Sequence, residues 1–447
     1  MTGAFDIASR RALWILGAFL TLLFLAGGSS WPHEIGLILL RPFAILISAY
    51  GLATLKVERL RPYWAILVIF ILALALTALH LVPLPPSVWQ SLPGREIIVE
   101  VDRLAGLGDV WRPLSMSPQG TLNALFALSV PMAILALAPQ LTLADQCRLI
   151  LLLLCLSLAS GLIIVLQAAG SDIALFPLTS ETSGVFANRN HQAALLAATF
   201  PLLATSTYVA MQLGLNRRLA LTLAGGIGIS LIPLIIVTGS RAGLALSALA
   251  ISLLPALRLP LFSGHGRRYS PRLRLAILGA SIFAIGAMVW LTIISARDVA
   301  ISRLDAGGED TRYPVWETVF HDLPNYLPWG SGVGTYIEVY KLHEPPKLLQ
   351  PLFSNHAHND WLEIIYTAGI PGTVLAVAAL CAWLTGVWQA RRGSGIQFTI
   401  SRTGLAMLLL LALASVTDYP VRTPLLSAVA TLAAIWSASY KRFRDEA

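Results

Sequence analysis

The sequence predicts an all-α polytopic membrane protein with about 12 transmembrane helices. Of its 447 residues, 56% are hydrophobic and 12% are charged, whereas soluble domains usually carry roughly twice that charged fraction. The apolar residues are gathered into runs of about 17–25 residues, the length that an α-helix needs to cross a bilayer. The basic residues lie mainly between alternate runs, a pattern typical of cytoplasmic connections. The formal net charge of +8 is therefore interpreted through membrane orientation, and no nucleic-acid partner is expected.

The predicted spans follow one another along residues 1–447 as a single integral membrane domain. Their approximate ranges, from length and hydropathy, are 12–28, 35–54, 63–82, 119–138, 147–169, 190–211, 218–238, 241–260, 273–294, 370–390, 402–416 and 423–440. With a cytoplasmic N-terminus, more than half of the 31 Lys and Arg residues fall in predicted cytoplasmic pieces, so both termini are expected to be cytoplasmic. The first run is interpreted as a retained span and not as a cleaved signal peptide.

Two long segments remain on the outer side of the predicted membrane. They cover about residues 83–118 and 295–369, and both contain Pro, Trp and Gly with mixed charge. These features predict ordered loops at the membrane interface, where Trp rings are enriched, and the second loop should contain short helices. Polar residues gather mostly at this outer face; Arg41, inside a predicted span, is the exception. The three cysteines lie in or beside apolar runs without CxxC spacing and indicate neither a disulfide nor a metal site.

The stretch SNHAHNDWLEIIYTAGIPGT, residues 354–373, places many polar groups before an apolar span. Ser354 or Asn355 is expected to cap a short helix that begins near His358, and the glycines and proline at 369–372 should break it before the span. A histidine at the entry of a helix on the membrane surface is a candidate general base. The alternative is a purely structural histidine, and the His356-x-His358 pair leaves zinc binding open.

Two arginines on the predicted outer side are candidate anion ligands. Arg241 lies in VTGSRAGLA, where Gly and Ser favour a break and a new helix would direct unpaired N–H groups outward. Its alternative role is an interfacial side chain that reaches lipid headgroups. Arg312 lies in GGEDTRYPVWETVF, a predicted loop followed by a helix, and its alternative role is a salt bridge with Glu309 or Asp310.

A third arginine, Arg189, precedes Asn190 and His191 at the start of another predicted span. Here helix capping by Asn188 or Asn190 is the alternative to a functional role. Arginines bind phosphate through paired hydrogen bonds, and a lipid-linked diphosphate reaches the protein at this depth of the bilayer. A reaction that needs both the arginines and a histidine is displacement of a diphosphate. The arginines would stabilise the leaving group, and the histidine would accept a proton from the attacking hydroxyl.

The motif also resembles the signature of the O-antigen ligase and polymerase superfamily of bacterial envelope glycan enzymes. That signature is matched by His358, Asn359, nine intervening residues, and then Gly369 and Gly372. TGSRAG and TRYPVW resemble the arginine-bearing segments of the family and would assign Arg241 and Arg312.

The resemblance implies a GT-C-like fold in the bacterial inner membrane with a periplasmic active site. It implies a metal-independent transferase without a cofactor, which takes a glycan from undecaprenyl diphosphate. Direct attack at the anomeric carbon would invert its configuration. The catalytic residue would be His358; the candidate substrate-binding residues are Arg241, Arg312, Arg189, Asn359 and His356.

Several functions remain open at this point. The first expectation is an O-antigen ligase with lipid A–core as the acceptor, followed by a polymerase that uses a lipid-linked glycan acceptor, and then an O-linked protein oligosaccharyltransferase. A transporter of lipid-linked glycan is the alternative from another class, although it should carry polar groups near the bilayer midplane and two related halves. A scaffold without chemistry would leave the histidine and the arginines without a role.

Overall fold

The structure is a computed structural model that describes residues 2–176, 182–257, 259, 312–349 and 354–443. Nine helical segments in these ranges are long and apolar enough to cross a membrane. The N-terminal half contains α1 (Thr2–Ala26), α2 (Gly36–Thr54), η1 (Val57–Tyr63), α3 (Trp64–Leu79), β1 (Pro83–Leu84), α4 (Pro86–Trp89), α5 (Glu96–Leu104), β2 (Arg112–Pro113), α6 (Pro118–Ala127), α7 (Ser129–Leu137), η2 (Ala138–Gln140) and α8 (Leu143–Ala168). The remainder contains α9 (Arg189–Gln212), α10 (Arg217–Val237), α11 (Arg241–Leu253), η3 (Leu254–Leu257), α14 (Arg312–Asp322), η5 (Leu323–Asn325), α15 (Tyr336–His343), η6 (Pro346–Leu348), α16 (Asp360–Ala390), α17 (Ile396–Thr417), η7 (Pro420–Arg422), α18 (Pro424–Ser437) and α19 (Ser439–Arg442).

These helices confirm the prediction of a helical protein with many membrane-spanning segments. The predicted spans at 241–260 and 423–440 correspond to the shorter apolar helices Arg241–Leu257 and Pro424–Ser437. The predicted span at 273–294 lies outside the described residues. The only departure from an all-α fold in the described ranges is an antiparallel ladder of two residues per strand, in which Pro83 pairs with Pro113 and Leu84 with Arg112.

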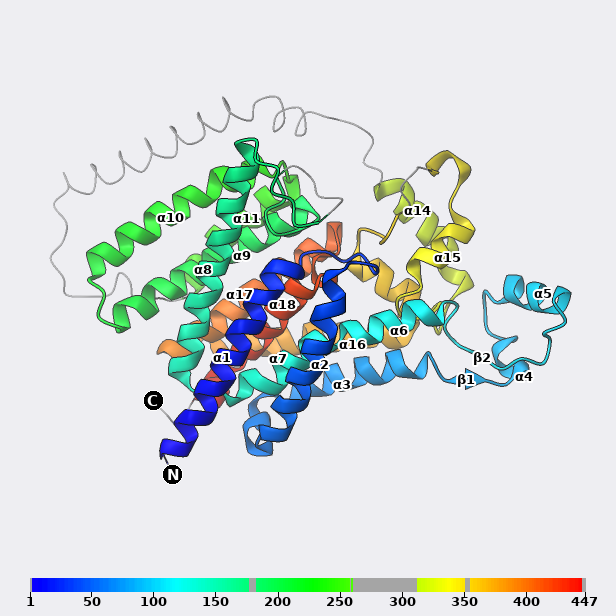
Figure 1. Cartoon of the computed structure of the whole chain (residues 1–447), viewed down its shortest axis with the longest axis horizontal. Helices are drawn as coiled ribbons and strands as arrows, with labels where there is room; N and C mark the ends of the chain where they lie inside the picture. Colours follow the sequence, from blue (N-terminus) through cyan, green and yellow to red (C-terminus); the bar gives the residue numbers. More distant parts are fainter. Residues whose placement is uncertain (1, 177–181, 258, 260–311, 350–353, 444–447) are drawn as a thin grey trace.

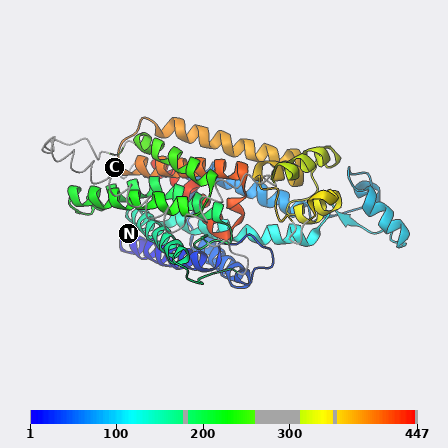
Figure 2. The ribbon, with the colours of Figure 1, turned by 90° about the horizontal axis from the view of Figure 1, so that it is seen from above.

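The centre of the bundle is formed by α9, α17 and α18 (Figures 1 and 2). α9 and α17 are the most enclosed candidate spans, with 78% and 67% of their apolar windows buried. Small residues let the helices approach closely, as is usual inside membranes. A Cβ added at Gly404 of α17 would lie 2.3 Å from the Ala433 carbonyl oxygen of α18, and one at Gly243 of α11 would lie 2.4 Å from the Ala193 Cβ of α9.

The short helices and the β-ladder lie at one end of the molecule, opposite the start of α1 and the last described residues (Figures 1 and 2). The end of α3 and the segment before α6 are joined to the loop before α15 by hydrogen bonds. The Met116 N–H donates to the Ser331 carbonyl at 2.9 Å, and the Val333 N–H donates to the His80 ring nitrogen Nδ1 at 3.1 Å. Arg95 adds a bond from its Nη2 to the Gly330 carbonyl oxygen at 3.4 Å. The segment at 83–118 is thereby attached to the loop that precedes the polar stretch.

The predicted break after the polar stretch is present, but α16 runs across it as one kinked helix. Gly369 has φ +60° and ψ −154° inside this helix, a conformation that only glycine adopts without strain. The backbone groups released by the kink are bonded by the preceding loop. The Gly332 N–H donates to the Thr367 carbonyl and the Ile370 N–H donates to the Pro328 carbonyl, both at 2.8 Å. Gly369 therefore provides both the bend and the space for this contact.

The helix begins close to its predicted start near His358, but the predicted cap, Ser354 or Asn355, was wrong. The helix begins at Asp360 and its N-cap is Asn359, whose side chain accepts a hydrogen bond from the Leu362 N–H at 3.1 Å. Ser354 instead donates to the His356 carbonyl at 2.8 Å. An asparagine fits the cap as well as a serine does, so the residue types alone did not select the position.

Candidate functional site

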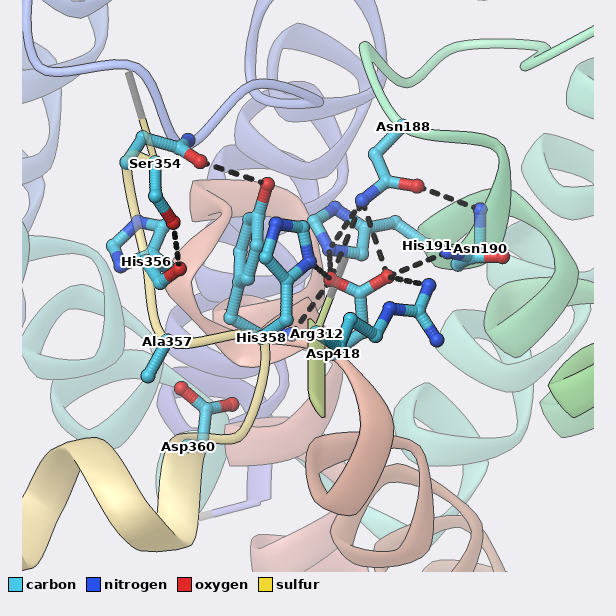
Figure 3. Close-up of polar contacts among 12 residues, drawn as sticks. Asn188, Asn190, His191, Arg312, Ser354, His356, Ala357, His358, Asp360 and Asp418 are labelled. Atoms are coloured by element: carbon cyan, nitrogen blue, oxygen red, sulfur yellow. Dashed lines mark hydrogen bonds and ion pairs between the residues drawn. The ribbon is translucent and has the colours of Figure 1, made fainter. Parts of the chain in front are cut away.

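A buried carboxylate, Asp418, is the centre of a cluster of polar side chains (Figure 3). It follows α17 directly and is 3% exposed. Asn190 donates to its Oδ2 at 2.7 Å, and Asn188 donates to both of its oxygens at 3.2–3.3 Å. A buried carboxylate needs such partners, because an unpaired one is very costly.

The asparagines come from the N-terminal end of α9. Asn188 is the N-cap, and its side-chain oxygen accepts a bond from the Asn190 N–H at 2.8 Å. The capping role considered for this residue is thus confirmed, and its amide nitrogen has a second role at Asp418. His191 in the first turn brings its Nε2 to 3.4 Å from Asp418 Oδ1. Its side chain is only 2% exposed, so it supports the carboxylate and cannot reach a substrate.

The polar stretch brings His358 to the same carboxylate oxygen. His358 Nδ1 lies 3.4 Å from Asp418 Oδ1, an ion-pair contact whose geometry falls short of a hydrogen bond. The residue has φ +50°, a left-handed conformation that is uncommon outside glycine and recurs at functional sites. Its side chain is 29% exposed. With Nδ1 directed at Asp418, the Nε2 atom is the one available to a ligand.

The second histidine of the stretch, His356, has a different environment. Its Nδ1 lies 3.2 Å from both carboxylate oxygens of Glu363, and its side chain is 13% exposed. The ring of Tyr419 separates the two imidazoles, with its centroid 4.3 Å from that of His356 and 4.9 Å from that of His358. The Tyr419 hydroxyl donates to Asn355 Oδ1 at 3.2 Å. The two histidines are thus held in different positions by different acids.

An ion network fixes the start of α16 below these rings. Arg422 of η7 pairs through Nε with Asp360 at 2.7 Å and through Nη1 with Glu363 at 3.0 Å. Ser415 of α17 donates to Asp360 at 2.8 Å. The Ala357 N–H donates to Glu363 at 3.0 Å. The backbone between the two histidines is therefore tied to α17 and η7.

The three predicted arginines are placed differently. Arg312 is the first residue of α14, is 25% exposed, and brings Nη2 to 3.8 Å from Asp418 Oδ2. Its considered partners Glu309 and Asp310 lie outside the described residues. Arg189 begins α9 and is partly buried.

Arg241 lies at the start of α11, as the sequence predicted. Ser240 is the N-cap and accepts a bond from the Gly243 N–H at 3.0 Å, after Gly239 with φ +63°. The Arg241 side chain is exposed. It forms no hydrogen bond with Asp418 or His358 in the described ranges. Gly243 of α11 packs against Ala193 of α9, which is two residues after His191. Arg241 therefore lies at the same end of the bundle as the cluster.

The electrostatics of the cluster favour an ionised Asp418. Burial alone would raise the pKa of this carboxyl, but the adjacent imidazoles of His191 and His358 hold its pKa well below the ordinary value. A carboxylate of this kind orients an imidazole and stabilises it once it gains a proton. No group of three or more His, Cys, Asp or Glu residues that could hold a metal occurs in the ranges that the structure describes.

Of the residues predicted from the sequence, the structure brings His358 and Arg312 to the cluster. Asp418 and Arg422 were not among the predicted residues. Both lie in TDYPVRTP, the short connection before the last predicted span. The available signal was an acid, a base and a tyrosine in an outer connection only a few residues long. Such residues are costly at a membrane boundary unless they are paired or functional.

Comparison with known proteins supports the resemblance. The family model described as O-antigen ligase matches residues 226–377, a range that includes Arg241, Arg312, His358 and the kink at Gly369. No curated protein matches the chain. The nine apolar helices of the described ranges indicate a membrane protein, and its residues 226–377 are similar to the O-antigen ligase family.

Proposed function

We propose that the chain transfers a glycan from undecaprenyl diphosphate to an acceptor hydroxyl at the periplasmic face of the bacterial inner membrane. The similarity of residues 226–377 to the O-antigen ligase family supports a glycosyltransferase of O-antigen ligase or polymerase type. The observation that carries the proposal is the pairing of the accessible His358 with the buried Asp418 at 3.4 Å, with Arg312 beside them. An enzyme needs both a base and a cationic pocket for this reaction, and both lie in one cluster.

In this mechanism His358 is the general base. Asp418 accepts from Nδ1, which leaves the Nε2 lone pair to take the proton from the acceptor hydroxyl. The hydroxyl oxygen then bonds to the anomeric carbon of the donor sugar, from the face opposite the diphosphate. The resulting imidazolium is stabilised by the adjacent carboxylate. The inverted configuration of the product follows from a single displacement.

The diphosphate is the leaving group. The bond from the anomeric carbon to the diphosphate oxygen breaks, and its electron pair goes to the diphosphate. Arg312 and Arg241 are proposed to bind this group, with Arg189 as a further candidate, because guanidinium groups form paired hydrogen bonds with phosphate. Their charge matters most when negative charge develops on the leaving oxygen. No metal is required by this scheme.

The test is His358→Ala with His343→Ala as its matched control. His343 is 34% exposed and its Nδ1 lies 3.3 Å from the buried Asp322, so it resembles His358 in exposure and pairing but lies outside the cluster. The purified variants are incubated with a polyprenyl-diphosphate glycan, candidate acceptors and a chelator, and products are identified by mass. We expect no transfer by the first variant, wild-type transfer by the second, and folded protein in both cases. Transfer by His358→Ala would remove this residue from the mechanism.

We propose the ligase reaction, with lipid A–core as acceptor, ahead of the polymerase reaction. The two are distinguished by the banding of surface polysaccharide after deletion of the gene. Loss of a ligase leaves long glycan on the polyprenyl carrier. Loss of a polymerase leaves single repeats on the acceptor.

A further inference from the structure

Arg41 is the one charged residue of α2 (Gly36–Thr54), and the mechanism above does not use it. Ionisable side chains inside membrane spans are rare, costly and usually functional. Arg41 donates from Nη2 to the side-chain oxygen of Asn123 on α6. Its buried Nε has no hydrogen-bond partner in the described part of the chain. A guanidinium with a donor left over is poised for a ligand.

This side chain lines a cavity of about 260 Å³ next to the candidate active site. The cavity is bounded by α2, α6, the loop before α15 and the connection before α18, and its walls are mainly apolar. Its polar lining includes Arg41, Asn355, His356, Glu363 and Arg422. An apolar pocket with a few convergent polar groups is typical of a small-ligand site, and this cavity is slightly smaller than the roughly 300–1,000 Å³ that such sites usually have.

The two arginines that line this cavity differ in their contacts with carboxylates. Arg422 is compensated by Asp360 and Glu363 at 2.7 and 3.0 Å, and His356 faces Glu363. Arg41 forms no ion pair with a carboxylate of the described residues; its bond is to an uncharged amide. Both carboxylates contact Arg422, and no carboxylate of the described residues contacts Arg41. An anionic ligand would supply that contact.

We propose that Arg41 and this cavity form an anion subsite for a phosphoryl group of the acceptor glycolipid. The inference rests on the proposed function, and it adds the chemical class of the second substrate. The donor diphosphate is proposed to bind Arg312 and Arg241, which lie at the starts of α14 and α11. The cavity lies instead beside Asn355 and His356, two residues from the proposed base. A glycolipid anchored there by its phosphate would present a hydroxyl to His358.

The test measures acceptor binding without donor, so it does not depend on catalysis. Wild-type protein, Arg41→Met and Arg41→Lys are compared in nanodiscs of phosphatidylcholine. The probes are labelled lipid A–core, the same molecule after removal of phosphate with hydrofluoric acid, and a polyprenyl-diphosphate-linked single repeat. Arg391→Gln is the matched control, because Arg391 follows α16 at its far end and stacks on Trp388. Thermal unfolding checks that Arg41→Met stays folded.

We expect Arg41→Met to weaken binding of one phosphorylated probe by about ten- to hundredfold, as for loss of a hydrogen bond to a charged group. Arg41→Lys should restore part of this affinity, and the dephosphorylated probe should bind all proteins equally weakly. Which phosphorylated probe responds identifies the source of the phosphate, in the core or in the polyprenyl diphosphate. Equal affinities of wild type and Arg41→Met for both phosphorylated probes would overturn the proposal, as would an equal loss for the dephosphorylated probe.

A second measurement separates this inference from the proposed function. In the transfer assay, Arg41→Met should raise KM for the acceptor and leave KM for the donor and kcat within about twofold of wild type. A raised donor KM with an unchanged acceptor KM would assign the cavity to the donor and overturn the inference. If His358→Ala retains transfer while the binding result holds, the proposed base is wrong and the anion subsite stands.

Discussion

Asparagine at position 418 tests the role of the carboxylate directly. The substitution keeps the shape of the side chain and one accepting oxygen for Asn188 and Asn190, but it removes the negative charge. The charge lies 3.4 Å from His358 Nδ1 and 3.8 Å from Arg312 Nη2. Its loss should therefore affect the imidazolium formed during transfer more than the resting fold.

The magnitude follows from the separation of the charges. At 3.4 Å, a carboxylate and an imidazolium attract each other by about 5 kcal/mol at an effective dielectric constant of ~20. This value is an upper limit, because the asparagine oxygen still faces the ring and water enters part of the space. We expect a loss of about 3–4 kcal/mol of transition-state stabilisation, which is roughly a 10²–10³-fold decrease in kcat. The KM for the donor should change much less.

The assay is the initial rate of glycan transfer by purified Asp418→Asn, together with its thermal unfolding. Asp322→Asn is the matched control. Asp322 is equally buried, accepts from Tyr366 and lies 3.3 Å from His343, but it is remote from the proposed chemistry. It should lower stability without lowering kcat. A kcat for Asp418→Asn within threefold of wild type would show that the base works without this carboxylate.

Three further predictions concern stability. Gly369→Ala should lower the free energy of unfolding by about 2–4 kcal/mol, because φ +60° strains a side chain and the new Cβ would lie 2.3 Å from the Pro328 oxygen. The control is Gly106→Ala, at φ +69° with open space around it. This substitution should lower the free energy of unfolding by only about 1–2 kcal/mol in the same thermal assay. Arg422→Ala should cost about 3–5 kcal/mol by leaving two buried carboxylates unpaired, and a wild-type unfolding temperature would contradict this. Because the pKa of Asp418 is lowered in the folded state, its ionisation stabilises the protein above about pH 4 and this stabilisation is lost as the pH falls further. The difference in unfolding temperature between wild type and Asp418→Asn should shrink below that pH, and a difference that is unchanged down to pH 2.5 would refute the assignment.

The sequence was most informative where a local physical rule decides the structure. Long apolar runs became helices, and the glycine and serine before Arg241 ended one helix and capped the next. Gly369 broke the helix after the polar stretch. Each of these outcomes depends on residues within a few positions of one another. Such rules predict where an element starts or bends, with an error of a few residues at a cap such as Asn359.

The contacts of Asp418 could not be predicted in this way. The carboxylate contacts Asn190, which is 228 positions away in the sequence, and His358, which is 60 positions away. No local pattern encodes which helix ends lie together, because that depends on how α9, α16 and α17 pack. The basic residues indicated the membrane side of each connection, but they carried no information on neighbours within that side. The acid was therefore visible in the sequence while its role was not.

The packing also explains why one histidine of the HxH pair is suited to act as a base. Glu363 bonds to His356 and also to the Ala357 N–H, and the Ala357 carbonyl accepts a bond from Trp316 at 2.7 Å. The backbone between the two rings is thus held on both sides, so the rings cannot exchange places. His356 faces an acid that Arg422 already neutralises, whereas His358 faces Asp418 and is the more exposed ring. Arg312 contacts Asp418 at 3.8 Å, whereas Arg422 contacts Glu363 at 3.0 Å. Asp418 therefore has more charge available to stabilise a proton gained by His358, and this difference favours His358 as the base.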